Sequence, residues 1–270
     1  MLKVDIPKIS AKIGKETEII SFGSCFSTEV AGRMANEGYT VTNNPFGTLF
    51  NPASIAQSIY RTISCRLFTP EEVIPRCTNI SKESGKAPNE GYVSFSHHGS
   101  FTRETPQEFL CYANRRLIET SEAFSRAKVV LITFGTAWIY RNTKNMEIVA
   151  NCHKHPSYEF VRERLSCEEI VRLFTPILEN NRDKEWIFTV SPIRHRKDGL
   201  HENALSKSIL LIAVEQLCRA FSNASYFPAY EIVLDELRDY SWFKEDEVHP
   251  TDEAVDYVYD KFTASRLQII

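Results

Sequence analysis

Residues 129–134 read Val-Val-Leu-Ile-Thr-Phe, and Gly135 ends this nearly unbroken apolar run. A run without polar alternation is typical of a parallel strand that helices cover on both faces. Two further runs of this kind lie on either side of it in the chain, one over 17–22 and one over 186–190. Together the three runs predict the centre of a mostly parallel sheet.

Amphipathic segments between and after these runs predict helices. Two of them begin at a Ser or Thr followed three residues later by Glu, which is a helix-capping pattern. The expected helices run from Phe26 to about Glu37, over 52–63 behind Asn51, from Thr105 to about Arg126, from Ser166 onward, over 206–221, and from Thr251 to about Arg266. We expect Pro176 to kink or end the fourth of these early. A short strand is expected near Tyr226, continuing through Ile232 and Val233.

The alternation of strand and helix predicts right-handed crossovers and an α/β fold. We therefore expect a three-layer α/β/α sandwich with a mostly parallel central sheet. The length of 270 residues is compatible with a single domain over 1–270. Residues 78–100 are rich in Ser, Gly, Lys and Asn, and they predict an insertion or long loop at about 65–105.

The composition, with 43% hydrophobic and 25% charged residues, is that of a chain that buries a core. A net charge of −3 does not suggest a nucleic-acid or polybasic membrane surface. No stretch approaches the ~20 apolar residues that span a bilayer, and the N-terminus does not resemble a signal peptide. Seven cysteines without a C-x-x-C pair argue against a disulfide framework and a zinc ribbon. We expect a cytoplasmic protein.

Chemistry is first expected at the turn after the strand over 17–22, because ligands of α/β sheets bind at the carboxyl ends of strands. The turn reads Gly23-Ser24-Cys25-Phe26. A thiol at the start of a helix would have a lowered pKa and be more nucleophilic. The alternative is structural: Ser24 or Ser27 caps the helix, and Cys25 is a small buried hydrophobic residue.

A second candidate lies just before the last expected helix, in the segment Asp246-Glu247-Val248-His249-Pro250. The spacing places a carboxylate and an imidazole on one short turn, where Asp246 can hold the tautomer of His249. The imidazole can then act as general base toward a nucleophile from another strand end. An ordinary surface turn remains the alternative.

Two other polar clusters follow expected strands. His153 and His155 suggest a metal-dependent hydrolase, but no third ligand follows at a recognisable interval. We therefore expect no metal and interpret His153 as lining a substrate cleft, with a solvated loop as the alternative. Arg194 and His195 lie in a basic loop that could bind an anionic group or remain solvated.

The two candidate blocks resemble those of the SGNH/GDSL hydrolase superfamily, and the first block resembles the GSCFA family. The likeness covers nearly the whole chain. It is carried by residues 23–26, Asn44-Pro45-Phe46-Gly47-Thr48-Leu49-Phe50-Asn51-Pro52, Phe134-Gly135-Thr136-Ala137-Trp138, Ser191-Pro192-Ile193-Arg194-His195, residues 226–231 and residues 246–250.

The resemblance implies an SGNH-like, flavodoxin-like fold and an esterase-like site. The superfamily's nucleophile is the third residue of its block, which here is Cys25, with Ser24 as a cap or oxyanion contact; Ser24 as nucleophile is the alternative. Gly23 belongs to the same block, and the Gly47 amide is an expected oxyanion donor. The superfamily's Asn donor is missing after Gly135, so Thr136, Asn44 and Asn51 are the candidates for the third donor.

The predicted function is an SGNH-like ester hydrolase or acyltransferase without a cofactor. Its predicted substrate is a small-molecule or glycan ester, such as an acylated carbohydrate. No nucleic-acid or membrane partner is expected, and the oligomeric state stays open. The alternative is a non-catalytic ligand-binding module on the same fold, suggested by the missing Asn and by the Ser in the superfamily's Asp position.

Overall fold

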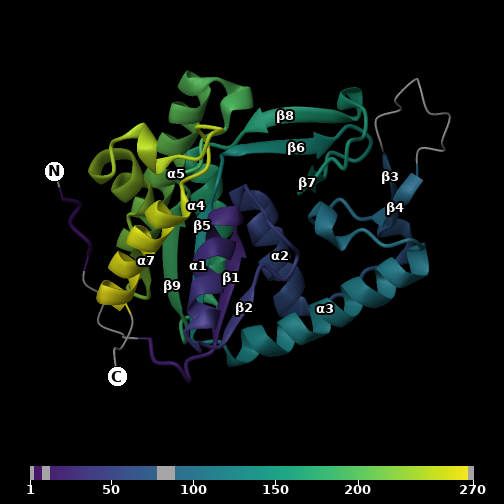
Figure 1. Cartoon of the computed structure of the whole chain (residues 1–270). Coiled ribbons are helices and arrows are strands. Elements are labelled where there is room, and N and C mark those ends of the chain that lie inside the picture. The colour runs from purple at the N-terminus through teal and green to yellow at the C-terminus, as the bar shows by residue number, and fades with distance from the viewer. Residues whose placement is uncertain (1–2, 8–12, 78–88, 267–270) are drawn as a thin grey trace.

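The protein is described here by a computed structural model that covers residues 3–7, 13–77 and 89–266. Its centre is a five-stranded parallel sheet (Figure 1). The strands are β1 (Ile19–Gly23), β2 (Val41–Asn43), β5 (Val129–Phe134), β9 (Glu185–Val190) and β10 (Ala224–Tyr226). They lie side by side in the order β2-β1-β5-β9-β10. Counted along the chain this order is 2-1-3-4-5, the flavodoxin-like arrangement, which confirms the predicted α/β fold.

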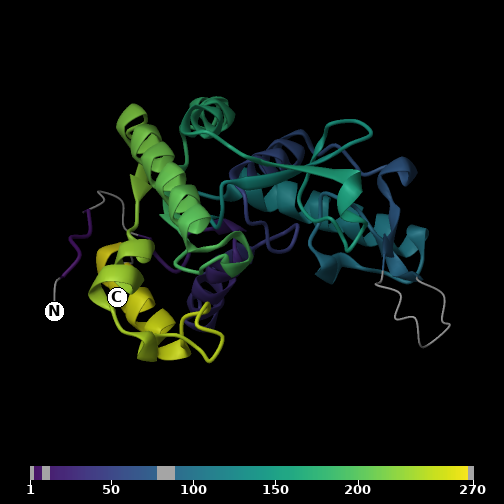
Figure 2. The same ribbon diagram turned by 90° about the horizontal axis from the view of Figure 1, so that it is seen from above.

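Helices cover both faces of this sheet (Figures 1 and 2). One face packs against α1 (Cys25–Asn36) and α7 (Asp252–Arg266). The other packs against α2 (Pro52–Ser64), α3 (Pro106–Arg126), α4 (Cys167–Glu179) and α5 (Leu200–Ala220). Successive residues of β5 alternate between the two hydrophobic clusters: Leu131 belongs to the first, and Val130 and Ile132 belong to the second. The strand is therefore apolar at nearly every position, as its sequence indicates.

Two expected boundaries were wrong, and one of two alternatives at Pro176 was wrong as well. Pro176 does not end α4 early, since the helix continues to Glu179, and the expected kink stays a prediction. The proline lies in the last turn, where its carbonyl accepts from the Asn180 N–H and little of the helix remains to be disrupted. Helix α5 begins at Leu200, six residues before the predicted start at Ser206. Strand β10 stops at Tyr226, because the chain turns helical after Pro228, and residues 232–236 form a π-helical turn.

Two antiparallel sheets lie outside the central one, on the side of the molecule away from α7 (Figures 1 and 2). The expected excursion at 65–105 carries β3 (Ile74–Cys77) paired with β4 (Asn89–Val93); residues 78–88 lie outside the described residues. A second excursion was not predicted. It contains β6 (Trp138–Asn142), β7 (Ile148–Val149) and β8 (Phe160–Arg164). That the chain is one domain stays a prediction.

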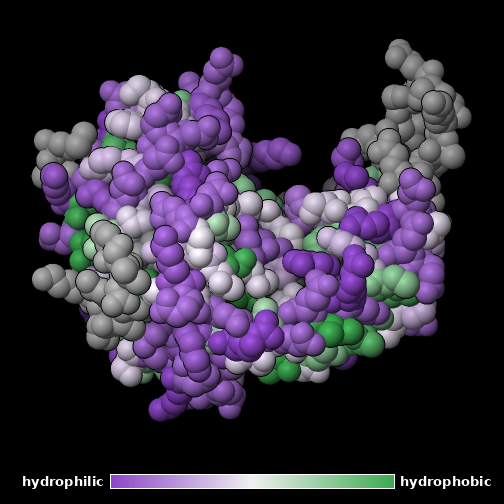
Figure 3. Space-filling model, turned by 60° about the horizontal axis from the view of Figure 1, so that its bottom comes forward, coloured by the Kyte–Doolittle hydropathy of each residue, from purple (hydrophilic) through white to green (hydrophobic). Residues whose placement is uncertain are grey.

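The surface mixes polar and apolar side chains. Figure 3 shows small groups of hydrophobic residues interspersed among hydrophilic ones on the face it presents. Within the described residues, no helix combines the length and the hydropathy that a membrane span requires.

Candidate active site

The turn between β1 and α1 lies at the carboxyl edge of the sheet and is fixed by its neighbours. Gly23 has a φ of +154°, and a Cβ there would lie 2.4 Å from the Thr133 carbonyl oxygen, so only glycine allows β1 and β5 to approach this closely. The Gly23 N–H donates to Asn44 Oδ1 (2.8 Å). The Ser24 N–H donates to the Thr133 oxygen (3.1 Å). Two strands therefore determine where Ser24 and Cys25 lie.

The two candidate nucleophiles differ in their surroundings. Ser24 is 1% exposed, and among the described residues its buried hydroxyl has no hydrogen-bond partner. It occupies the N-cap position of α1, but its side chain makes no capping bond. Cys25 is half-buried and packs against the same hydrophobic cluster as Val248, the residue before His249. Cys25, not Ser24, therefore presents its side chain toward accessible space.

The expected lowering of the Cys25 pKa was wrong in direction. Burial raises the pKa of the thiol, and this effect outweighs the opposing hydrogen bonds from the backbone of Phe26 and of Cys25 itself. Among nearby charges, Glu29 raises the pKa of Cys25 further and Lys207 lowers it. The start of a helix does not by itself produce a thiolate here.

Asp246 and His249 form the predicted pair. His249 Nδ1 lies 2.6 Å from Asp246 Oδ2. The other carboxylate oxygen accepts the N–H groups of Val248 and His249, both at 2.9 Å. Hydrogen bonds from the backbone and the ring of His249 hold the pKa of Asp246 well below its usual range. Because Nδ1 faces the carboxylate, Nε2 is left as the basic nitrogen of the ring.

The basic loop after β9 holds the turn that carries this pair. Arg196 Nη1 donates to the Asp246 carbonyl (3.0 Å), and Arg194 Nη1 donates to the Glu247 carbonyl (3.3 Å). The Arg194 guanidinium also lies 4.4 Å from the centre of the Phe243 ring. The loop, for which anion binding and solvation were both left open, thus makes protein contacts that support the His249 turn.

His195 lies closer to the centre of the site. It forms a hydrogen bond with the backbone of Gly135, and its ring packs edge-on to Phe50 at 6.1 Å. Burial lowers the pKa of His195 to about 4, with smaller contributions from the positive charge of Lys207 and from His249. His195 therefore stays neutral at physiological pH and lies within electrostatic reach of both groups.

Most of the predicted oxyanion donors are already engaged. The Gly47 N–H donates to the Asn44 carbonyl (2.7 Å), and the N–H groups of Gly135 and Thr136 both donate to the Phe50 carbonyl (2.8 and 2.9 Å). The Thr136 hydroxyl lies 3.1 Å from the Ser206 hydroxyl. These groups shape the carboxyl edge of the sheet and are not free to hold an oxyanion in this conformation.

Of the two asparagines considered as oxyanion donors, Asn44 is fully engaged and Asn51 is not. Asn44 uses both ends of its amide, with Oδ1 on Gly23 and Nδ2 on the Thr28 hydroxyl (2.9 Å). Asn51 caps α2 through Oδ1, which accepts the Ser54 N–H (2.8 Å). Within the described residues, Asn51 Nδ2 makes no hydrogen bond, so it keeps two donors for a ligand.

The histidines of the Asn151–His155 segment do not join this site. His153 is buried, and its Nε2 lies 2.8 Å from the Ser94 carbonyl oxygen. His155 contacts Glu159 and the Pro75 carbonyl with its two ring nitrogens. In the described part of the chain, no group of three His, Cys, Asp or Glu side chains is arranged to hold a metal ion.

Sequence reasoning missed Lys207. This residue of α5 is 1% exposed, and its Nζ donates to the carbonyls of Gly135 (2.6 Å) and Ser191 (2.7 Å). Burial lowers the pKa of Lys207 to about 7, while the charge of Cys25 raises it. The available signal was its position on the buried stripe of α5 between Asn203 and Leu210, where a lysine is out of place.

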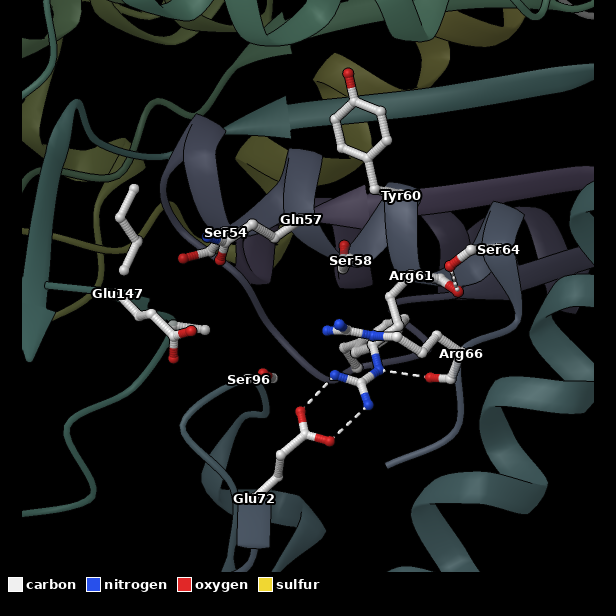
Figure 4. A pocket seen from close by; sticks show the side chains of 13 residues that line it. Ser54, Gln57, Ser58, Tyr60, Arg61, Ser64, Arg66, Glu72, Ser96 and Glu147 are labelled. Atoms are coloured by element: carbon white, nitrogen blue, oxygen red, sulfur yellow. Dashed lines mark hydrogen bonds and ion pairs between the residues drawn. The ribbon is translucent and has the colours of Figure 1, made fainter. Parts of the chain in front are cut away.

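A cleft of about 420 Å³ runs beside α2 (Figure 4). Ser54 and Gln57 line it from the first turns of the helix, which Asn51 caps. Arg61 and Glu72 line another part as a bidentate ion pair with contacts of 2.5 and 2.8 Å. Its lining also includes the exposed side chains of Gln57, Arg66 and Glu147, which can contact a polar ligand.

The protein is an α/β protein with two polar features at one edge of its sheet. These are the Gly-Ser-Cys turn after β1 and the Asp246–His249 pair before α7. The model of the GSCFA family matches residues 18–262, and the chain therefore belongs to the GSCFA family.

The remaining comparisons give distant likenesses. A structure from Streptococcus pneumonia, described provisionally as a platelet activating factor, is 8% identical, with a TM-score of 0.41 over 92% of this chain and 84% of that one. A carbohydrate esterase family 2 enzyme with a carbohydrate binding domain, from Corynascus thermopiles (Myceliophthora fergusii), is 10% identical, with a TM-score of 0.34 over 97% and 68%. No curated protein matches the chain.

Proposed function

We propose that this protein is an SGNH-like ester hydrolase or acyltransferase in which Cys25 is the nucleophile and His249 the general base. One observation carries the proposal: the 2.6 Å contact between His249 Nδ1 and Asp246 Oδ2, which leaves Nε2 basic. The strand edge that presents Cys25 is the place where α/β proteins of this order bind ligands.

Cys25 is the better nucleophile because of access. Its thiol is partly exposed, whereas the Ser24 hydroxyl is buried. A thiol whose pKa is raised by burial needs a base to take its proton at neutral pH, and His249 supplies one. Within the described residues no hydrogen bond joins Cys25 to His249. Catalytic hydrogen bonds are often long in the absence of substrate, so the proposal requires this contact in the complex.

The reaction proceeds in two halves. His249 Nε2 takes the thiol proton, Cys25 Sγ attacks the ester carbonyl carbon, and a tetrahedral oxyanion forms. The oxyanion collapses to a thioester, and the leaving alkoxide takes the proton back from His249. His249 then deprotonates water or an acceptor hydroxyl, which attacks the thioester carbon, and the departing Cys25 sulfur takes the proton back from His249. Asp246 keeps the imidazole in the tautomer that both halves require.

The oxyanion needs donors other than those expected from the sequence. The backbone N–H groups of Cys25 and Phe26 lie in the first turn of α1, where helix amides have no intrahelical acceptor, and both lower the pKa of the Cys25 thiol. Asn51 Nδ2 is the side-chain donor that we assign as the third. Asn51 follows Leu49, whose N–H bonds the Gly23 carbonyl at 2.9 Å, so it lies at the same sheet edge.

The proposed substrate is an acylated carbohydrate. The cleft beside α2 is lined by Ser54, three residues after Asn51, and by the exposed side chains of Gln57, Arg66 and Glu147, which can hydrogen-bond sugar hydroxyls. We expect the acyl group at Cys25 and the sugar in this cleft. Hydrolysis and transfer differ only in the acceptor that enters the second half of the reaction. A cytoplasmic location and the absence of a cofactor stay predictions of the sequence.

The test is the pH dependence of Cys25 alkylation by iodoacetamide, read by peptide mass spectrometry, together with the intact mass after exposure to an activated acetate ester. We expect Cys25, and not the exposed Cys111, to gain one acetyl group from the ester and to lose this selectivity in His249→Ala, while alkylation measures the pH at which Cys25 ionises. If Cys25 neither reacts selectively nor becomes acylated, Cys25 is not the nucleophile.

A binding module is the second candidate, and one observation favours it. The amides of Gly47, Gly135 and Thr136, where an oxyanion hole was expected, are all bonded to other backbone groups. A module of this kind would bind a glycan in the α2 cleft without forming an acyl intermediate. Acylation of wild-type protein at Cys25 would eliminate it.

A further inference from the structure

Lys207 is a buried cation that the mechanism above does not use. It belongs to the inward stripe of α5, together with Asn203, Ser206, Leu210 and Val214. Moving an ammonium out of water is costly unless its donors and its charge are satisfied. A lysine in this position therefore requires a structural or functional explanation.

Two of its three N–H donors have clear partners. They bond the carbonyls of Gly135 and Ser191, the residues that directly follow β5 and β9. These bonds fix the ammonium at the carboxyl edge of the sheet, between two strand ends. One donor and the positive charge itself remain to be accounted for.

Cys25 lies at the same edge. Gly23 is in register with Thr133, and the Ser24 N–H bonds the Thr133 carbonyl, only two residues before Gly135. The charged groups that act on the Cys25 thiol are Glu29 of α1 and Lys207 of α5. In turn, Cys25 and His195 are the titratable groups that interact with Lys207. The buried ammonium thus has a potential counter-charge in an ionised Cys25.

We propose that Lys207 is a positioning residue of this site, whose ammonium, held on the Gly135 and Ser191 carbonyls, stabilises the Cys25 thiolate. The proposal rests on the proposed role of Cys25 as nucleophile. The thiol proton still goes to His249, and the thiolate that forms favours the charged form of Lys207, so the ammonium is present when the thiolate is. Such preorganised charge is most effective in a site that excludes water.

The first test compares the midpoint of the pH dependence of Cys25 alkylation in wild type, Lys207→Met and Glu29→Gln, with Cys111 as the internal reference. Lys207→Met should raise the midpoint by about 1 pH unit or more, because a nearby opposite charge is lost. Glu29→Gln is the matched control of opposite sign, since its carboxylate raises the pKa of Cys25, and it should lower the midpoint. Lys207→Arg keeps the charge and should restore the wild-type midpoint if it folds.

Lys207→Met leaves two buried carbonyls without a partner and could fail to fold, so the second test leaves Lys207 in place. Interaction between two titrating groups is reciprocal. In Cys25→Asp, which places a negative charge at position 25, the midpoint of Lys207 should lie above its value in the uncharged control Cys25→Ser, and NMR of ε-carbon-labelled lysine follows both.

The outcomes separate the two proposals. If wild-type Cys25 is selectively acylated, yet Lys207→Met does not move the Cys25 midpoint and the Lys207 midpoint is the same in Cys25→Asp and Cys25→Ser, Lys207 is purely structural and this inference is overturned. If wild-type Cys25 shows no selective reactivity, the proposed nucleophile fails and the role of Lys207 fails with it. Movement of either midpoint in the stated direction supports the pairing.

Discussion

The two halves of the candidate site are built differently. The nucleophile turn is part of the sheet: Ser24 is 1% exposed, and the N–H groups of Gly23 and Ser24 are bonded to Asn44 and Thr133. The turn with the Asp–His pair lies at the surface, where the side chains of Asp246 and His249 are 48% and 49% exposed. Its supports are local bonds and two arginine contacts to its carbonyls.

This difference indicates which property each half controls. Any change that moves the nucleophile turn must also move β1 against β5, so its geometry is tied to folding. The His249 turn can be altered with little effect on the core, because its bonds are few and solvent-exposed. We therefore expect substitutions in the first half to lower stability and substitutions in the second half to lower activity.

The largest effect is expected from His249→Ala. Loss of the general base should reduce kcat/KM for ester substrates by about 100-fold or more, while the exposed position should leave thermal stability unchanged. Steady-state kinetics and a thermal melt measure the two quantities. His201→Ala, at an exposed position on α5, is the control and should retain full activity. Equal kinetics in the two variants would exclude His249 as the base.

Gly23→Ala should lower the stability of the protein, the property that His249→Ala leaves unchanged. The added methyl group would meet the Thr133 carbonyl oxygen at 2.4 Å, and we expect the free energy of unfolding to fall by about 2 kcal/mol or more. The matched control is Gly32→Ala within α1, where a Cβ meets nothing within 4 Å and should stabilise the helix slightly. Denaturant titration measures both. A Gly23→Ala variant as stable as wild type would contradict the close packing of β1 on β5.

Asp246→Asn should also lower activity without lowering stability, but by less than His249→Ala. An amide cannot hold the His249 tautomer as the carboxylate does, so kcat should fall by about tenfold or more without loss of stability. The lowered pKa of Asp246 keeps the carboxylate charged through mildly acidic pH, so the acid limb of the wild-type rate profile should not report its protonation. A pH–rate series on wild type, Asp246→Asn and the exposed control Asp260→Asn tests this. If the acid limb disappears only in Asp246→Asn, the limb does report protonation of Asp246 and this prediction is wrong.

The sequence was most informative where a short segment determines its own structure. The run over 129–134 became β5, and the capping patterns at Thr105 and Ser166 became the starts of α3 and α4. The Asp246–His249 contact was predictable for the same reason, since three residues separate its partners. Strand β2 has three half-exposed residues, too few for a periodic pattern, and it was missed.

Features assembled from distant segments were not predictable. Lys207 acquires its role from carbonyls 72 and 16 residues away, and no local pattern contains that information. The occupied amides of Gly135 and Thr136 depend on Phe50, which reaches them from the loop before α2. The support of the His249 turn by Arg194 and Arg196 likewise joins residues about fifty positions apart.

The smallest expected effect concerns that support. Arg196→Gln removes a charged donor from the Asp246 carbonyl, and because the arginine side chain is itself 59% exposed, we expect kcat/KM to fall only about twofold to threefold. Arg219→Gln, an exposed ion-pair residue on α5, is the control and should have no effect. Since a single surface contact contributes this little, a tenfold loss in Arg196→Gln would mean that the His249 turn is as rigidly determined as the nucleophile turn. The nucleophile turn and the His249 turn would then not differ in rigidity, and the His249 position would have to be treated as part of the core.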